Sequence, residues 1–413
     1  MDARQGNAVP RPAGRAVTDS PLRIAIFAES YLPYLSGVTV STEALARGLV
    51  ADGHDVLLLA PRPARGTTPG TAGAAGPQPR VAWLPSVQLP PPAPPGYRIP
   101  VPFGSSALRR AIAFDPQIVH ANSPFVSGAM ARRVAARVGA PLVFTHHTRF
   151  GDYRHYLGPL ARPGAAALEA HLLRFWSRCA AVIAPGADLA AEITERLGER
   201  ARPRVAWIPT GIEVADIAAM PARDPRRLAA WPADTVVIAS LGRLAREKSV
   251  DLLLAAFAAA AAADPRLRLL VIGGGPSRAS LAADALRLGI ADRALLTGAL
   301  PRAEALALLK GANLFAFAST TETQGLVVAE ALACGLPAVA VDAPGTRDAV
   351  RSGIDGLLVP AAGLGNALAE LVADPLRRAE MAAAAIAGAP RFDRAARIGE
   401  VVDLYRALLG EAG

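Results

Sequence analysis

Short apolar runs alternate with longer helical segments along most of this chain, and this alternation restricts the possible folds more than any other feature. Short apolar runs are typical of buried strands, and strands separated by helices favour a parallel, doubly wound sheet. We therefore predict the α/β fold class, with two Rossmann-like domains that face each other across a ligand-binding cleft. The expected strands lie at residues 22–28, 55–60, 117–120, 142–145 and 181–184, and then at 236–242, 267–275, 294–298, 313–319 and 336–342.

The residues outside the two series indicate where the domains begin and end. Residues 1–20 are polar and lack an apolar stretch, so they predict a disordered tail and not a secretory signal. Residues 61–100 hold so many Pro, Gly and Ala residues that we expect a long exposed loop. The predicted parts are a tail at 1–20, a first domain at 21–208, a second domain at 209–390 and a final helix at 391–413.

The 413-residue chain carries a formal net charge of +9, and most of the excess lies in its first half. Residues 1–200 contain 21 arginines against 13 acidic residues, whereas residues 201–413 contain 23 basic against 22 acidic residues. A one-sided positive field suits an anionic partner, such as a phospholipid membrane or a nucleic acid. An arginine-rich genome composition would also produce part of the excess, since only two basic residues are lysines.

No segment predicts insertion into a membrane. The longest apolar run, Leu252–Ala263, is mostly alanine and is shorter than the roughly 20 residues that a spanning helix needs. We therefore expect a cytoplasmic protein. Cys179 and Cys334 lie far apart in apolar surroundings, which predicts two buried thiols and not a disulfide framework.

The most informative stretch is STTETQGLVVAEALACGLPAVA at residues 319–340. Here Glu322 and Glu330 enclose a turn at Gly325 and the start of a predicted helix. Eight helical positions span roughly 12 Å, which is similar to the distance between the sugar ring and the ribose of a nucleotide sugar. One carboxylate could then accept hydrogen bonds from the sugar and the other from the ribose. The alternative, two solvated helix carboxylates, is disfavoured by the neighbouring motifs.

Two basic residues follow the first strand of the second series. Arg243 and Lys248 lie in LGRLAREKSV, directly beyond that strand. A forked guanidinium and a compact ammonium suit a diphosphate, whose charge grows as its bond to a sugar breaks. A solvated basic turn is the alternative. Gly273 begins a Gly-Gly-Gly-Pro sequence after the next strand, where backbone amides could approach a phosphate or a base.

The first half offers weaker signals at its strand ends. Gly37 follows Ser36 at the start of a predicted helix, where exposed amides favour an anion, although an ordinary turn explains this glycine equally well. His120 ends one predicted strand, and His146 and His147 end another, so all three are expected at the rim of the cleft. A histidine at a strand end is often structural, but three of them predict that at least one is functional.

Several familiar motifs are missing from the sequence. It contains no Asp-x-Asp pair, no zinc-type cluster, no P-loop and no G-x-G-x-x-G sequence. These absences argue against metal-dependent sugar transfer, nucleotide hydrolysis by a P-loop enzyme and dinucleotide-dependent oxidoreduction. We expect no metal and no cofactor, only a nucleotide diphosphate sugar as donor substrate.

In this order the segments SLGRLAREKSV, VIGGGP, LTG and TETQGLVVAEALACGLPAVA resemble the retaining glycosyltransferases of family four, which have the two-domain GT-B fold. The likeness extends over about residues 22–360. It implies metal-independent transfer of a hexose with retention of configuration, in which the donor phosphate helps to take the acceptor proton. It also implies that the first domain holds the acceptor, the second holds the donor, and the final helix crosses back to the first domain.

The resemblance also implies individual roles. Arg243 and Lys248 would bind the donor diphosphate, Glu322 the donor sugar and Glu330 the ribose, with Gly37 on the phosphate from the opposite domain. Many relatives carry a second histidine, often regarded as catalytic, where this chain has Asn122. The expected catalytic residues are Glu322, His120, Asn122 and His147, and the remaining donor-binding residues are Gly273, Thr323, Gln324, Gly325 and Leu326.

Within the family, TETQG together with THHTRFGDYRHYL and PPGYRIPVP is similar to the branch that glycosylates diacylglycerol or related lipids. Residues 153–178 mix arginines with aromatic and leucine side chains, which predicts a basic amphipathic surface on anionic headgroups. An ordinary packed helix is the alternative. The expected membrane or acceptor residues are Tyr153, Arg154, Tyr156, Arg174, Trp176 and Arg178.

The leading hypothesis is therefore a peripheral enzyme on the inner face of the cell membrane that transfers glucose from UDP-glucose to a diacylglycerol-type lipid. Its partners would be the nucleotide sugar, the lipid acceptor and an anionic membrane surface, and not a nucleic acid. The first alternative keeps the enzyme class with a mannosyl donor or a soluble sugar, polyprenyl or phosphoinositide acceptor. The others are a nucleotide-sugar epimerase or hydrolase of GT-B-like fold, and a nucleic-acid-binding protein.

Overall fold

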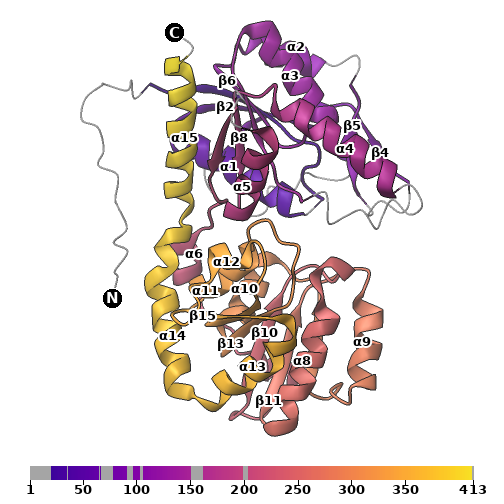
Figure 1. The fold of residues 1–413 in the computed structure, drawn as a ribbon, viewed down its shortest axis with the longest axis vertical. Coiled ribbons are helices and arrows are strands. Elements are labelled where there is room, and N and C mark those ends of the chain that lie inside the picture. Colours follow the sequence, from indigo (N-terminus) through magenta and orange to yellow (C-terminus); the bar gives the residue numbers. More distant parts are fainter. Residues whose placement is uncertain are drawn as a thin grey trace.

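The computed structural model describes residues 20–34, 36–64, 66, 78–90, 96–102, 106–149, 161–198 and 203–411. Two α/β domains follow one another along the long axis of the molecule, and the yellow C-terminal helices run alongside both (Figure 1). Each domain is built on a parallel sheet, which confirms the predicted fold class. The predicted tail lies outside the described residues except for Ser20.

The sheet of the first domain has seven parallel strands in the order β3-β2-β1-β6-β7-β8-β9. Helices α1 and α15 cover one face, and α2, α3, α4 and α5 cover the other. The chain first adds β2 and β3 on one side of β1 and later returns to add β6 on its other side, so the topological switch point lies between β1 and β6. The strands are β1 (Arg23–Phe27), β2 (Asp55–Pro61), β3 (Arg80–Leu84), β6 (Ile118–Ala121), β7 (Leu142–Thr145), β8 (Ala181–Ala184) and β9 (Arg204–Trp207), and the helices are α1 (Gly37–Ala51), α2 (Ser106–Ala113), α3 (Val126–Val138), α4 (Ala161–Trp176) and α5 (Ala187–Leu197).

The second domain has six parallel strands in the order β12-β11-β10-β13-β14-β15. Its strands are β10 (Val236–Leu241), β11 (Leu267–Ile272), β12 (Ala294–Gly298), β13 (Leu314–Phe317), β14 (Ala338–Val341) and β15 (Gly356–Val359). Its helices are α7 (Pro225–Ala229), η2 (Arg246–Lys248), α8 (Val250–Ala263), α9 (Arg278–Arg287), α10 (Arg302–Lys310), α11 (Leu326–Ala333), α12 (Thr346–Ala349), η3 (Ala361–Gly363), α13 (Leu364–Ala373) and α14 (Pro375–Gly388).

The apolar run in α8 packs against the second sheet together with α9 and α13. Within the described residues, no helix is both long and apolar enough to cross a membrane. The central strands are buried at every position or at all but one, which is why they appear as continuous apolar runs in the sequence. They are β1, β2, β6, β7, β8, β10, β11, β13 and β14.

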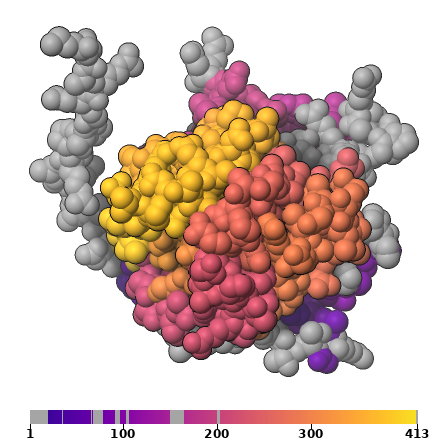
Figure 2. All heavy atoms as spheres, turned by 90° about the horizontal axis from the view of Figure 1, so that it is seen from below, coloured from indigo at the N-terminus to yellow at the C-terminus, as the bar shows by residue number. Residues whose placement is uncertain are grey.

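Two connections join the domains. The first runs from β9 to α6 (Val214–Ala219), and the second runs from η4 (Ala389–Phe392) to α15 (Arg394–Glu411). They are tied to each other, because the Ile212 amide donates to the Phe392 carbonyl at 2.8 Å and the Arg394 amide donates to the Ile212 carbonyl at 3.0 Å. Beyond this point α15 packs on α1 of the first domain (Figure 1). Seen from below, the yellow C-terminal segment lies against the salmon and orange segments of the second domain (Figure 2).

The expected loop at residues 61–100 contains three strands, so that prediction is wrong for them. β3 pairs with β2 as an edge strand of the first sheet, and its alternating sequence RVAWL fits a strand with one covered face. β4 (Ser86–Gln88) and β5 (Arg98–Pro100) form a separate antiparallel pair. The proline- and glycine-rich sequence around these short strands concealed them.

Candidate active site

The two domains face each other through the carboxyl ends of their strands. Thr323, beyond β13, donates from its Oγ1 to the carbonyl of His147, beyond β7, at 3.0 Å. The amide of Ala187, at the start of α5, donates to Asp348 Oδ2 of α12 at 2.8 Å. Gly186 approaches the Thr323 carbonyl so closely that a Cβ atom would lie 2.0 Å from its oxygen. Open parallel sheets bind ligands at these ends, so the candidate site lies where the domains meet.

Lys248 and Glu322 are brought together on the second domain's side of this boundary. Lys248 ends η2, beyond β10, and Glu322 follows the neighbouring strand β13. The Lys248 Nζ donates to Glu322 Oε1 at 2.5 Å, and the two side chains are 25% and 14% exposed. Gly345, at φ +78°, lies against this loop, because a Cβ atom there would be 2.8 Å from the Glu322 carbonyl oxygen. Both side chains are partly buried, and their opposite charges leave the pair with no net charge.

Arg243 lies in the loop beyond β10 and faces the first domain. Its Nη2 is 3.7 Å from Glu247 Oε1, and nearly half of its side chain is exposed. Burial raises the pKa of Tyr34, in the first domain, and the nearby positive charge of Arg243 opposes this rise. The guanidinium therefore lies close enough to Tyr34 to act on it across the domain boundary.

The glycine run supports the Arg243 loop. Gly273, at φ +148°, would place a Cβ atom 1.9 Å from the Gly242 carbonyl oxygen, so no other residue fits without displacing that loop. The Leu244 amide also donates to the Gly274 carbonyl at 2.9 Å. Packing alone accounts for glycine at this position.

Two helix N-termini belong to the same region. α11 begins directly after Gly325, at φ +72°, and no side chain caps its first turn, where Leu326 is half-buried. α1 begins at Gly37, where the N-cap Ser36 accepts a hydrogen bond from the Thr39 amide at 3.1 Å, and the space over Gly37 is open. Uncapped amides at a helix N-terminus attract anions, so α11 offers a phosphate position beside the Lys248–Glu322 pair.

Gln324 is engaged by the connection between the domains. Its Oε1 accepts from the Thr210 amide at 2.7 Å, and its Nε2 donates to the Thr210 carbonyl at 2.6 Å. The Thr210 hydroxyl in turn lies 2.7 Å from the Ser41 hydroxyl of α1. The side chains of Thr323 and Gln324, expected on the donor, thus tie the Glu322 loop to the first domain and its linker.

Glu330 is separated from the Lys248–Glu322 pair. It is buried in α11 and forms an ion pair with Arg302, at the start of α10. Burial raises the pKa of Glu330, and the charge of Arg302 opposes that rise. The carboxylate expected at a ribose is therefore covered by a half-exposed arginine that sequence reasoning did not single out.

His120 does not lie at the open rim, so that prediction is wrong. Its Nδ1 shares a hydrogen bond with the Tyr405 hydroxyl of α15, and its Nε2 shares one with Thr145 Oγ1 at 2.7 Å. The side chain is fully buried, and burial lowers the pKa of His120 to about 3. Both ring nitrogens are engaged inside the protein, which points to a structural role.

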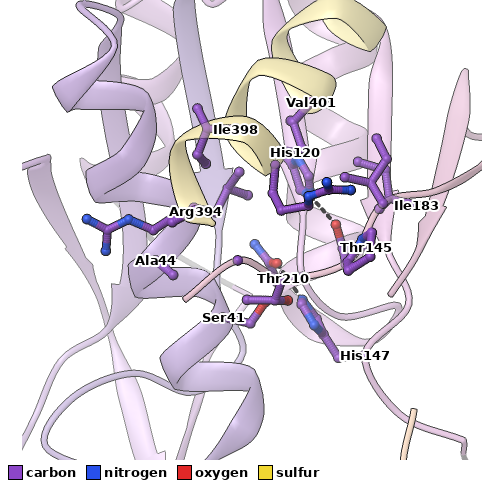
Figure 3. A pocket seen from close by; sticks show the side chains of 16 residues that line it. Ser41, Ala44, His120, Thr145, His147, Ile183, Thr210, Arg394, Ile398 and Val401 are labelled. Carbon is purple, nitrogen blue, oxygen red and sulfur yellow. Dashed lines mark hydrogen bonds between the residues drawn. The ribbon is translucent and has the colours of Figure 1, made fainter. Parts of the chain in front are cut away.

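His147 lines a small cavity under the interdomain connection (Figure 3). Asn122 lines the same cavity. His147 Nε2 donates to Asn122 Oδ1 at 2.7 Å, while Asn122 Nδ2 is buried and lacks a partner among the described residues. Desolvation lowers the pKa of His147 to about 3. The cavity measures about 40 Å³, enough for about three waters at roughly 10–15 Å³ each.

The expected membrane surface at residues 153–178 is only partly in the described residues, because Tyr153, Arg154 and Tyr156 lie outside them. Arg174 and Arg178 are exposed. Trp176 is 2% exposed, packs in the first domain's core and donates from its indole Nε1 to His146 Nδ1 at 3.2 Å. The prediction of an exposed tryptophan is therefore wrong: α4 turns Phe175 and Trp176 inward and Arg174 outward.

Sequence reasoning also missed two aromatic side chains of the first domain. Tyr34 and Tyr97 form an edge-to-face pair with ring centroids 5.1 Å apart. They lie 63 positions apart in breaker-rich sequence, and no local pattern relates them. The described residues hold no cluster of three or more histidine, cysteine or acidic side chains arranged to bind a metal ion.

Comparisons with known proteins agree with this architecture. Residues 35–216 match the family model Glycosyltransferase Family 4, and residues 224–391 match Glycosyl transferases group 1. A sucrose-phosphate synthase of Thermosynechococcus elongatus has a similar structure, with a TM-score of 0.74 and 22% identity over 94% of this chain and all of the other. An Anabaena protein, HepE, in complex with UDP and glucose, has a TM-score of 0.68 and 18% identity with the same coverage. These structures support the GT-B fold.

Relatives found by sequence have a higher identity to this chain than these structures do, but their names describe different reactions. An alpha-monoglucosyldiacylglycerol synthase of Streptococcus pneumoniae is 30% identical over 82% of this chain and 75% of the relative. A GDP-mannose-dependent alpha-mannosyltransferase of Mycobacterium tuberculosis is 31% identical over 85% and 87%. A D-inositol 3-phosphate glycosyltransferase of Thermobispora bispora is 32% identical over 73% and 74%. The two matching halves and these relatives show that the chain belongs to glycosyltransferase family 4.

Proposed function

We propose that this chain is a retaining, metal-independent hexosyltransferase that moves glucose from UDP-glucose to a diacylglycerol-type lipid. The observation that carries the proposal is the Lys248–Glu322 pair, held beside the uncapped start of α11 and near Arg243. Two fixed cations and a helix N-terminus suit a diphosphate. The name of the Streptococcus pneumoniae relative supports the choice of glucose and a diacylglycerol.

Donor binding would redistribute the Lys248–Glu322 pair. A diphosphate competes for the Lys248 ammonium, and the released Glu322 carboxylate can then accept hydrogen bonds from sugar hydroxyls. Arg243 and Lys248 stabilise the charge that grows on the leaving diphosphate. In a front-face reaction the leaving phosphate oxygen takes the acceptor proton, so no protein base is required. The engagement of both His120 nitrogens supports this assignment.

Two relatives keep a second candidate open within the same enzyme class. The names of the Mycobacterium tuberculosis and Thermobispora bispora proteins support a mannosyl donor or a phosphorylated polyol acceptor. Neither changes the proposed use of Lys248 and Glu322, because all nucleotide diphosphate sugars present a diphosphate and sugar hydroxyls. The donor and acceptor therefore need a direct test.

That test offers purified protein UDP-glucose or GDP-mannose together with diacylglycerol vesicles or a soluble inositol phosphate. Mass spectrometry should detect a hexosyl lipid with UDP-glucose, proton NMR should show the α-anomer, and a chelator should leave the rate unchanged. Glu322→Ala should abolish transfer. A β-linked product, loss of activity with the chelator, or full activity of Glu322→Ala would contradict the proposal.

An arginine face on the first domain supports a peripheral position on an anionic membrane. The neighbouring helices α2 and α3 (Figure 1) contain no acidic residue. Their five arginines are exposed, and none is within ion-pair distance of a carboxylate in the described part of the chain. Each such side chain near anionic headgroups contributes about 1 kcal/mol of attraction. This arginine face consists of Arg109, Arg110, Arg132, Arg133 and Arg137.

Vesicle sedimentation tests this position. Wild-type protein should pellet with phosphatidylglycerol vesicles at low salt, be released by high salt, and ignore phosphatidylcholine vesicles. Arg132→Glu should weaken pelleting, whereas the control Arg227→Glu, an exposed arginine of the second domain, should not. Equal pelleting of both variants would exclude the arginine face as the contact surface.

A further inference from the structure

The topological switch point of the first sheet carries a carboxylate that nothing above assigns. Glu29 lies two residues beyond β1, and its Oε2 accepts a hydrogen bond from the Ser127 amide at 2.8 Å. Ser127 is in the first turn of α3, which follows β6 on the other side of the switch point. Ligands of open α/β sheets bind outside the carboxyl ends of the strands at such a point.

The Glu29 carboxylate is buried but only half satisfied. The residue is 8% exposed, and no lysine, arginine or histidine is within ion-pair distance of it in the part of the chain that the structure describes. The start of α3 stabilises Oε2. Oε1 has no hydrogen-bond partner among the described residues, and it is not among the atoms sealed from solvent. A buried carboxylate is costly without partners. The Oε1 atom is therefore left to accept a hydrogen bond from water or from a ligand.

Two tyrosines extend from Glu29 toward the second domain. β5, which begins directly after Tyr97, packs on α3, and the first turn of α3 binds Glu29. The charge of Glu29 also adds to the effect of burial in raising the pKa of Tyr97 to about 12. Tyr97 packs edge-to-face on Tyr34. The positive charge of Arg243 acts on Tyr34, because it opposes the rise in the Tyr34 pKa that burial causes. Carboxylate, aromatic pair and arginine therefore follow one another from the first domain to the proposed diphosphate position.

We propose that Glu29 binds the acceptor: its free Oε1 accepts a hydrogen bond from a hydroxyl group of a neutral polyol headgroup, such as glycerol or a sugar, beside the Tyr34–Tyr97 pair. This inference rests on the proposed function and narrows the acceptor class. A carboxylate favours hydroxyl donors and repels a phosphate in a partly buried site. The subsite thus selects a neutral diacylglycerol or glycolipid headgroup over a phosphorylated polyol.

The test compares Glu29→Gln with wild type and with a control variant, Glu195→Gln. Glu195 is an exposed residue of α5, so the control removes the same charge away from the site. Glutamine retains an oxygen for the Ser127 amide, so the start of α3 is preserved, and circular dichroism and thermal melting check the fold. Because a charge-assisted hydrogen bond is replaced by a neutral one, Glu29→Gln should raise the KM for the hydroxyl acceptor about ten-fold with a smaller change in kcat. The calorimetric Kd for UDP should stay unchanged.

The acceptor series separates the possible outcomes. Glu29→Gln should also lower the ratio of kcat/KM for diacylglycerol to kcat/KM for inositol phosphate, because the charge that repels the phosphate is gone. An unchanged acceptor KM in folded Glu29→Gln, or a wild-type preference for the phosphorylated acceptor, would overturn this inference while transfer itself stands. Absence of hexosyl transfer by wild-type protein to every acceptor would instead overturn the proposed function on which it rests.

Discussion

At the scale of single residues, we expect the chain's two lysines to have different roles, one in catalysis and one in stability. Lys248 Nζ donates to Glu322, whereas Lys310 Nζ donates to the carbonyls of Ile217, Ala218 and Met220 at the end of α6. Lys248→Ala should lower kcat/KM about 10- to 150-fold, the equivalent of the roughly 1.5–3 kcal/mol of a charged hydrogen bond. Lys310→Ala should leave the donor Kd unchanged but lower the free energy of unfolding by about 1–3 kcal/mol.

Steady-state kinetics and urea unfolding of both variants separate the two roles. Lys248→Ala should melt close to wild type, because its ion pair is partly exposed and such pairs add little to stability. If Lys248→Ala transfers at the wild-type rate, Lys248 does not act on the donor. If Lys310→Ala instead loses donor affinity, the assignment of the two lysines is reversed.

At the scale of elements, the Gln324–Thr210 contact joins the Glu322 loop to the linker after β9. Gln324→Ala removes both hydrogen bonds and leaves Glu322 without this fixed reference to the first domain. We expect kcat to fall about ten-fold or more, since small displacements of a positioned group are costly, while the calorimetric Kd for UDP changes less.

A second glutamine provides the control for Gln324→Ala. Gln117 also braces backbone, because its Oε1 accepts from the Arg23 amide at 3.0 Å, but it lies at the amino ends of β1 and β6, away from the site. Gln117→Ala should lower stability and leave kcat unchanged. Equal kcat values for the two variants, at equal melting temperatures, would show that the Gln324 contact is only structural.

Elements that are recognisable from local sequence were predicted, and features that depend on distant partners were not. β1, β2, β7 and β8 coincide closely with their apolar runs, because strands buried on both faces need no partner to be recognised. The role of His120 depends on Tyr405, which lies 285 positions away in α15. The inward direction of Trp176 depends on His146, and neither partner can be read from a strand end or a helix pattern. Sequence motifs singled out Lys248 and Glu322 separately, as ligands of a diphosphate and a sugar, but not their ion pair, which joins residues 74 positions apart.

At the scale of the whole molecule, four of the six histidines, all in the first domain, are at least partly buried in surroundings that resist protonation. Burial lowers the pKa of His54 from its ordinary value. It lowers the pKa of His146 to about 4 and those of His120 and His147 to about 3. The unfolded chain, with histidine pKa values near 6.5, therefore binds more protons than the folded chain below that pH. The free energy of unfolding must then fall on acidification, by up to about 1.4 kcal/mol per pH unit for each histidine.

Urea unfolding at pH 7.5, 6.0 and 5.0 measures this slope in a range where most carboxylates stay ionised. We expect stability to be highest at pH 7.5 and to decline steadily below about 6.5. His146→Gln should reduce the change in the free energy of unfolding with pH by up to about 1.4 kcal/mol per pH unit, the contribution of one proton. It should also weaken the fold at neutral pH, because it removes the acceptor of the Trp176 indole. Gln117→Ala, which also weakens the fold but removes no titratable group, should leave the slope at its wild-type value. A pH-independent free energy of unfolding across this range would mean that the histidines titrate alike in both states, which burial of His120 between Tyr405 and Thr145 does not allow.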